Sequence, residues 1–155
     1  MKRFHVHLHV DDLDRSIAFY SNLFASAPTR VEADYAKWML DDPRINFAIS
    51  TAGPEKGIDH LGIQVESADE LVEMKRRAGA ANRTVFDEGE TTCCYARSEK
   101  HWVTDPQGIS WENYQTIEDT PSFGQRRDRV SHQVQGWCGK AADRAGLFRR
   151  KKACC

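Results

Sequence analysis

Apolar and polar residues alternate along the first ten positions of the chain, which is the pattern of a half-buried β-strand. One set of alternate positions is apolar, namely Val6, Leu8 and Val10. The other set consists entirely of histidine: His5, His7 and His9. Because residues i and i+2 of a strand share a face, we expect the apolar set to pack under a helix and the histidines to line a cavity.

Two segments carry the periodicity of an amphipathic helix. The first, Asp12–Phe24, has an apolar stripe at helical spacing, and Asp11 or Asp12 can cap its amino end. The second, Ala68–Ala78, opens with acidic residues, which the helix dipole favours, and Gly79 stands where a helix stop is expected. Each predicted helix therefore follows a predicted strand.

The chain repeats itself once. His5 and His60 are each followed, after four residues, by a valine and an acid. Trp38 and Trp102 each open a second shared pattern, with Asp, Ile and an aromatic residue at the same spacing. The offset between the copies grows from 55 to 64 residues, so the second copy holds about nine extra residues, which we expect to form a loop around 82–100.

Each repeat predicts the order βαβββ, and two such units predict an α+β domain. We expect a curved mixed β-sheet that encloses a cavity, with the helices outside. The units span about residues 1–52 and 57–118 of a domain that covers residues 1–120, and residues 121–155 form a basic, flexible tail.

Composition and charge narrow the function classes. The chain has 155 residues, enough for about one domain. Residues 121–155 hold nine Lys or Arg and two Asp, a net charge of +7, which leaves −8 for residues 1–120 and argues against nucleic-acid binding by the body. The chain has neither an apolar run of membrane-spanning length nor the apolar core of a signal peptide at its start, so we expect a cytoplasmic protein without membrane contact.

Three residues form a candidate metal site. His5 and His60 hold equivalent positions in the two units, so pseudo-twofold pairing would bring them together. Glu112 lies on the last predicted strand, on a face where an unpaired carboxylate is rare, and its counterpart in the first unit is Ala48. Two imidazoles and one carboxylate are typical of non-haem Fe(II) sites with open coordination positions, although Zn²⁺ would also accept them.

The neighbouring cysteines Cys93 and Cys94 lie within the extra residues of the second unit. They are either two small half-buried strand residues, a strained vicinal disulfide that a reducing compartment disfavours, or a clamp for a soft, thiophilic atom. Lys100 is close enough in sequence to lower their pKa values. Cys138, Cys154 and Cys155 lie in the tail and receive no role.

Several of these residues resemble the vicinal oxygen chelate superfamily, which includes glyoxalase, extradiol dioxygenases and bleomycin-resistance proteins. The resemblance covers roughly residues 3–118. It is carried by His5, Val10-Asp11-Asp12-Leu13, Ser16-Ile17-Ala18-Phe19-Tyr20, Asp59-His60-Leu61-Gly62, Asp105-Pro106-Gln107-Gly108 and Trp111-Glu112. The superfamily motif indicates the fold better than the reaction.

The run from Thr91 to Ala96, before Trp102, resembles the organoarsenical carbon–arsenic lyases and their cadmium-induced relatives. The resemblance implies Fe(II) on His5, His60 and Glu112, and trivalent arsenic on Cys93 and Cys94. It further implies an O₂-dependent lyase of dioxygenase type that releases arsenite from methyl or aromatic arsenicals. Around this core of the site, we expect substrate contacts from Lys100, Tyr95 and His7.

Two alternatives remain at this point. One is another metalloenzyme of the same fold, such as a glyoxalase-type isomerase or a thiol transferase that confers resistance; Ala48 argues against the fourth ligand such enzymes often need. The other is a non-catalytic protein that sequesters cadmium or arsenite. A purified sample could carry other divalent metals, and pairing of units between chains would give a homodimer.

Overall fold

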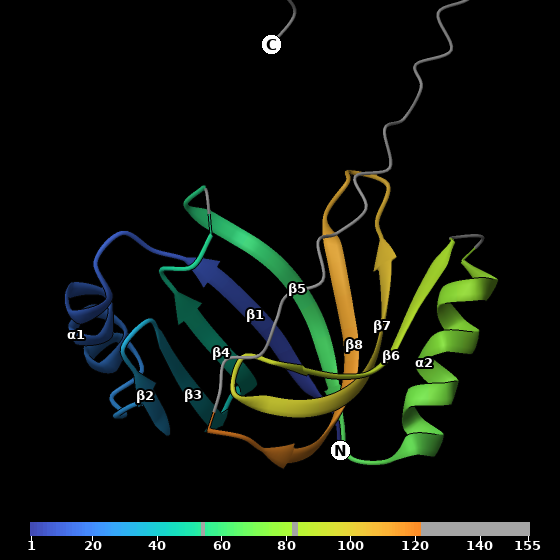
Figure 1. Cartoon of the computed structure of the whole chain (residues 1–155), viewed down its shortest axis with the longest axis horizontal. Coiled ribbons are helices and arrows are strands. Elements are labelled where there is room, and N and C mark those ends of the chain that lie inside the picture. Colours follow the sequence, from blue (N-terminus) through green and yellow to red (C-terminus); the bar gives the residue numbers. More distant parts are fainter. Residues whose placement is uncertain (54, 82–83, 122–155) are drawn as a thin grey trace, which may run out of the picture.

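The computed structural model describes residues 1–53, 55–81 and 84–121, in which two helices and eight strands follow the predicted order (Figure 1). The elements are β1 (Arg3–His9), α1 (Leu13–Leu23), β2 (Arg30–Glu32), β3 (Tyr35–Asp41), β4 (Arg44–Ser50), β5 (Gly57–Val65), α2 (Ala68–Ala80), β6 (Val85–Cys93), β7 (Ala96–Thr104) and β8 (Ser110–Asp119). The predicted basic tail, with Cys138, Cys154 and Cys155, lies outside the described residues.

All eight of these strands form one mixed sheet, in the order β2-β3-β4-β1-β5-β8-β7-β6. Each half contributes four strands, and the halves meet where β1 pairs antiparallel with β5. Within the halves, β1 runs parallel to β4 and β5 runs parallel to β8. The sheet curls strongly, with α1 beside the first half and α2 beside the second, which confirms the predicted α+β class (Figure 1).

The core under α1 explains why β1 presents its histidines to the other face of the sheet. The buried residues Ala36, Trp38, Phe47 and Ile49 form the centre of this core. The apolar face of β1 and the stripe of α1 pack against them, through Val6, Leu8, Val10, Leu13, Ile17, Tyr20 and Phe24. Because alternate strand residues point to opposite faces, this packing turns the histidine face toward the hollow of the sheet.

The helices begin where the sequence indicates. Asp12 caps α1 by accepting a hydrogen bond from the Arg15 amide, and Ser67 caps α2 by accepting one from Glu70. The expectation that α2 stops before Gly79 is wrong, because the helix continues to Ala80. Among the described residues, neither helix is long and apolar enough to cross a membrane.

The extra residues of the second unit do not form the expected loop. They lengthen a hairpin, in which β6 and β7 have nine residues each where β2 has three and β3 seven. Cross-strand pairing continues from Val85–Val103 to Cys93–Ala96, so ladder hydrogen bonds satisfy this backbone. The cysteine pair therefore lies at the tip of a regular hairpin and not in an irregular loop.

Candidate metal centre

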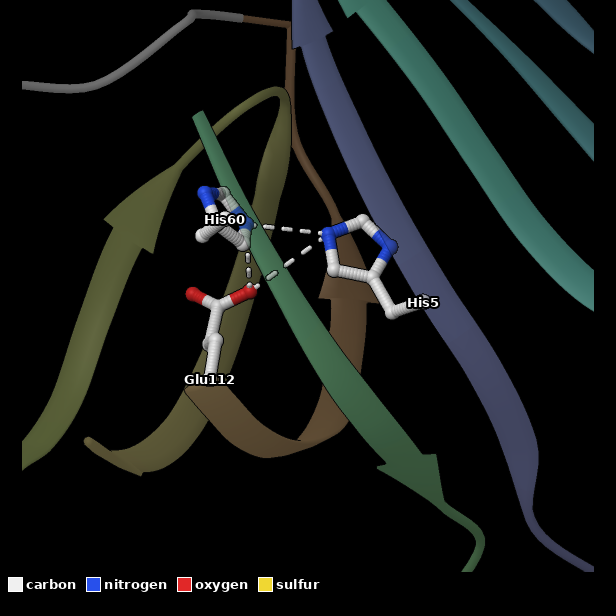
Figure 2. A group of neighbouring side chains, drawn as sticks. All are labelled: His5, His60 and Glu112. Atoms are coloured by element: carbon white, nitrogen blue, oxygen red, sulfur yellow. Dashed lines mark hydrogen bonds and ion pairs between the residues drawn. The ribbon is translucent and has the colours of Figure 1, made fainter. Parts of the chain in front are cut away.

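Three strands bring the predicted triad together in the hollow of the sheet. His5 comes from β1, His60 from β5 and Glu112 from β8, and all three side chains point toward a common point (Figure 2). The Nε2 atoms of His5 and His60 are 3.1 Å apart. Oε2 of Glu112 lies 3.4 Å from Nε2 of His60 and 3.7 Å from Nε2 of His5.

These distances fit a single divalent ion. The three donor atoms lie within 4.8 Å of one another, and the three residues are only 5%, 4% and 6% exposed. Metal bonds of about 2.0–2.2 Å to imidazole nitrogen and carboxylate oxygen require donor separations of roughly 3–4 Å. The donor set of two nitrogens and one oxygen suits iron, manganese, nickel or zinc.

The second nitrogen of each imidazole fixes the orientation of the ring. Nδ1 of His5 is 3.0 Å from the carbonyl oxygen of Asn46, which can only accept, so Nδ1 donates and Nε2 keeps its lone pair. Nδ1 of His60 donates to Oδ2 of Asp59 at 2.6 Å. Burial lowers the pKa of His60, but hydrogen bonds to Asp59 and Glu112 outweigh burial and raise this pKa, so a metal ion at its Nε2 would displace a proton. Such outer partners orient histidine ligands in metal sites.

The strand register explains why Glu112 has Ala48 as its counterpart. Gly62, two residues after His60, pairs with Glu112, and His7, two residues after His5, pairs with Ala48. Ala48 lines the cavity but offers no donor atom. The position equivalent to Glu112 in the first half is therefore open.

Lys100 balances the buried charge of the triad. Its Nζ lies 2.6 Å from Oε1 of Glu112, which leaves Oε2 facing the histidines. Burial raises the pKa of Glu112, but Lys100 and His60 outweigh burial and hold that pKa well below its usual value. Burial and the neighbouring His60 lower the pKa of His5 to about 4, so this ring is neutral at pH 7. Neutral imidazole and ionised carboxylate are the states that bind metal ions.

The cysteine pair forms the tip of the β6–β7 hairpin. Cys94 and Tyr95 are the two turn residues and have φ angles of 54° and 62°, as a type I′ turn requires. The Sγ atoms of Cys93 and Cys94 are 3.2 Å apart, too long for a disulfide. Both cysteines line a cavity of about 40 Å³ together with the triad.

Lys100 has the expected direction of effect on Cys94, whose pKa it lowers, but other effects on this thiol are larger. Its hydrogen bond with Cys93 and its burial raise the pKa of Cys94 well above the usual value, and the opposing effect of Lys100 is smaller. Lys100 instead pairs with Glu112. Cys94 is therefore a protonated thiol at pH 7.

The remaining predicted site residues divide into two groups. His7 and Lys100 line the cavity, whereas Tyr95 lies outside its lining. The Tyr95 hydroxyl donates to Asp34 at 2.8 Å, and its carbonyl accepts from Arg30 of the edge strand β2 at 3.1 Å. Arg30 also donates to the carbonyl oxygen of Thr120 at 2.8 Å. Tyr95 thus ties the cysteine hairpin to the opposite edge of the curled sheet.

Sequence reasoning missed several residues that support the site. Asn46 donates to the Tyr114 hydroxyl at 2.7 Å, and both residues line the cavity. Asp59, which orients His60, is its direct neighbour in the chain, so the pair Asp-His was a signal that could have been used. Tyr35 and Lys37, which also line the cavity, gave no such signal.

Comparison with known proteins places this chain in a family. The model of the glyoxalase/bleomycin resistance protein/dioxygenase superfamily matches residues 2–113. A trivalent organoarsenical cleaving enzyme of Bacillus sp. strain MD1 is 44% identical over 119 residues, which cover 75% of this chain and 74% of the relative. One from Thermomonospora curvata is 34% identical, with coverage of 83% and 86%. The cadmium-induced protein CadI of Mycobacterium tuberculosis is 35% identical, with coverage of 80% and 82%.

Solved structures agree on the fold. The Mn(II)-bound glyoxalase of Novosphingobium aromaticivorans superposes with a TM-score of 0.56 at 20% identity, covering 84% of this chain and 44% of that one. The 2,3-dioxygenase LapB of Pseudomonas sp. KL28 gives a TM-score of 0.57 at 21% identity, with coverage of 76% and 41%. At these identities the likeness concerns the fold alone. The chain belongs to the glyoxalase/bleomycin resistance protein/dioxygenase superfamily.

Proposed function

We propose that this protein cleaves the carbon–arsenic bond of trivalent organoarsenicals in an O₂-dependent reaction and releases arsenite. His5, His60 and Glu112 hold Fe(II), and Cys93 and Cys94 hold the arsenic. The observation that carries the proposal is that a thiol pair and a metal-binding triad line one cavity. The names of relatives at 34–44% identity support the same substrate class.

The thiol pair has the spacing of a chelate for one soft atom. Two bonds of about 2.3 Å, the length that thiolates make to metal ions, span the 3.2 Å between the sulfur atoms. A trivalent arsenical with two hydroxyl groups exchanges two As–O bonds for two As–S bonds, and each thiol proton leaves in a water molecule. This exchange consumes protonated thiols, which agrees with the raised pKa of Cys94.

Binding the arsenic fixes the organic substituent within the cavity, which supplies the proximity that the reaction needs. Fe(II) held by His5, His60 and Glu112 would supply the redox chemistry with O₂, and Ala48 contributes no further ligand to it. The buried Lys100–Glu112 pair keeps the carboxylate ionised at neutral pH. Few of the residues around the triad are exposed, so bulk water is largely excluded from it.

The test is anaerobic loading with Fe(II), addition of methylarsenite, and exposure to O₂, with released arsenite as the readout. Cys93→Ser and Cys94→Ser should abolish arsenic binding and turnover while metal content stays unchanged. Cys138→Ser removes one thiol from the tail and is the matched control, which should keep its activity. Full activity in either Cys93→Ser or Cys94→Ser would refute the arsenic clamp.

Glu112→Ala should show the opposite behaviour, with loss of iron and retention of arsenic. Metal analysis and arsenic titration on the same sample measure both properties. If the variant keeps iron at the wild-type level, the triad is not the metal site.

A second candidate is sequestration of cadmium or arsenite without turnover, which the cadmium-induced relatives and the spacing of the thiols favour. It predicts stoichiometric binding of the ion with no consumption of O₂. An oxygen electrode in the same assay separates the two functions.

A further inference from the structure

A second cluster of metal-binding side chains lies beside the triad and is not used by the proposed reaction. The strand face that carries His5 also carries His7 and His9, which are 3% and 6% exposed. Asp59, at the start of the next strand, faces these two rings with a side chain that is 10% exposed. Three imidazoles, those of His7, His9 and His60, therefore surround one buried carboxylate.

One of the three imidazoles is hydrogen-bonded to Asp59, and the other two lie farther from it. Oδ2 of Asp59 accepts a hydrogen bond from Nδ1 of His60 at 2.6 Å. By contrast, Nδ1 of His7 is 3.9 Å from the same oxygen, and Nε2 of His9 is 3.9 Å from Oδ1. A separation of 3.9 Å is longer than a hydrogen bond but fits two ligands of one metal ion, whose bonds are about 2.0–2.2 Å each.

The second nitrogen of His7 supports this geometry. Nε2 of His7 lies 2.9 Å from the hydroxyl of Ser50. In the tautomer that donates to this hydroxyl, the lone pair of Nδ1 faces the Asp59 carboxylate. Two acceptors that face each other in a buried site are stabilised by a cation between them.

We propose that Nδ1 of His7, Oδ2 of Asp59 and Nδ1 of His60 form a second site for a divalent cation, joined to the first by the His60 ring. One donor atom from each of these residues lies within 4.8 Å of one from each of the others. The hydrogen-bonded Nδ1 of His60 and Oδ2 of Asp59, 2.6 Å apart, would have to separate to about 3 Å to share an ion. Two imidazole nitrogens and one carboxylate oxygen suit a borderline first-row ion such as Zn²⁺ or Co²⁺.

The shared ring makes the two sites neighbours without placing the ions in contact. His60 directs Nε2 to the triad and Nδ1 to Asp59, so one imidazole bridges both ions. Binding at Nδ1 releases one proton from the ring to solvent. With this second site empty, the same nitrogen donates to Asp59, as the structure shows.

His9 and Gly53 support the cluster from behind. A Cβ atom at Gly53 would lie 1.8 Å from Nδ1 of His9, so only glycine leaves room for this ring. The ring in turn faces Oδ1, the second oxygen of the Asp59 carboxylate. This packing keeps the carboxylate directed toward His7.

Counting ions tests the proposal independently of arsenic and of turnover. The full chain is stripped with a chelator, its accessible thiols are alkylated with iodoacetamide, and it is equilibrated with Co²⁺. Elemental analysis then gives the ions per chain. We expect two equivalents in the wild type and one in Glu112→Gln, which loses the first site but keeps the second.

His7→Asn should also hold one equivalent, and the double variant with Glu112→Gln should hold none. His101→Asn removes a buried imidazole from β7, away from both clusters, and should hold as many ions as the wild type. Circular dichroism reports whether His7→Asn folds. If this variant does not fold, the numbers of ions bound by the wild type and by Glu112→Gln test the proposal. A single equivalent in the wild type with none in Glu112→Gln, or an unchanged count in a folded His7→Asn, overturns the second site.

Discussion

Replacing Lys100 with methionine tests whether a metal ion and this lysine stabilise the same carboxylate. Methionine keeps most of the volume and removes the charge, so Glu112 loses its partner at 2.6 Å. The side chains of Lys100 and Glu112 are only 5% and 8% exposed, so water cannot replace the lost partner. In the metal-free variant the buried carboxylate of Glu112 therefore keeps His60, 3.4 Å away, but loses its lysine partner.

The expected loss of stability is large. Breaking a buried ion pair by removing one partner costs about 3–5 kcal/mol. In a domain of this size, a change of 1 kcal/mol shifts Tm by about 4 °C, so Lys100→Met should lower the Tm of the metal-free protein by about 12–20 °C. A divalent ion at 100 times its Kd adds about 2.7 kcal/mol to the wild type. The increase in unfolding free energy on metal binding should be larger in Lys100→Met, because no lysine competes with the ion for Glu112.

Differential scanning calorimetry of the chelator-treated and metal-loaded proteins measures both effects. The double variant Lys100→Met/Glu112→Gln is the control, since it removes both charges and should be more stable without metal than Lys100→Met alone. A Tm within a few degrees of the wild type for metal-free Lys100→Met would refute the buried pair. An equal gain on metal loading in both proteins would refute the competition for one carboxylate.

Three further predictions concern the packing of the sheet, helix α2 and the loss of stability at acidic pH. Gly62→Ala would place a Cβ atom 2.1 Å from the Glu112 carbonyl oxygen, so it should lower the unfolding free energy in urea by about 3 kcal/mol and weaken metal binding. Gly79→Ala has open space around it on α2 and should stabilise by about 0.5–1 kcal/mol. Between pH 6.5 and about 4, metal-free unfolded chains bind a proton at His5 that the folded protein does not, so stability falls with falling pH by up to about 3 kcal/mol. Urea titrations across that range should show a shallower fall in His5→Gln, and an unchanged slope would contradict the buried neutral ring.

The triad could be predicted because two simple periodicities specify it. Alternation along β1 indicates which face carries His5, and the internal repeat relates His5 to His60 before any pairing is known. The register then places Glu112 beside Gly62 as the repeat requires. Residues whose partners depend on the curl of the sheet, such as Asn46 with Tyr114, have no local signal and were missed.

The cysteine hairpin was mispredicted as a loop for an identifiable reason. Two-residue hairpin turns are usually indicated by Asn-Gly or Asp-Gly, because both turn residues need a positive φ. Here the turn is built from Cys94 and Tyr95, which carry side chains in the left-handed region at a cost of order 1 kcal/mol or more each. The sequence therefore lacks the usual signal of the turn, although the strands on either side are regular.

The link between Arg30 and Tyr95 has a consequence for how the molecule can be divided. The sulfur-bearing turn belongs to the second half of the chain, yet its backbone is held by a guanidinium from the first half, 65 residues earlier. A fragment that begins after β4 would contain both thiols. It would lack Arg30 and Asp34, the two residues of the first half that hydrogen-bond to Tyr95 in the turn. Removing the first half would therefore disturb the thiols even where every residue of the second half is retained.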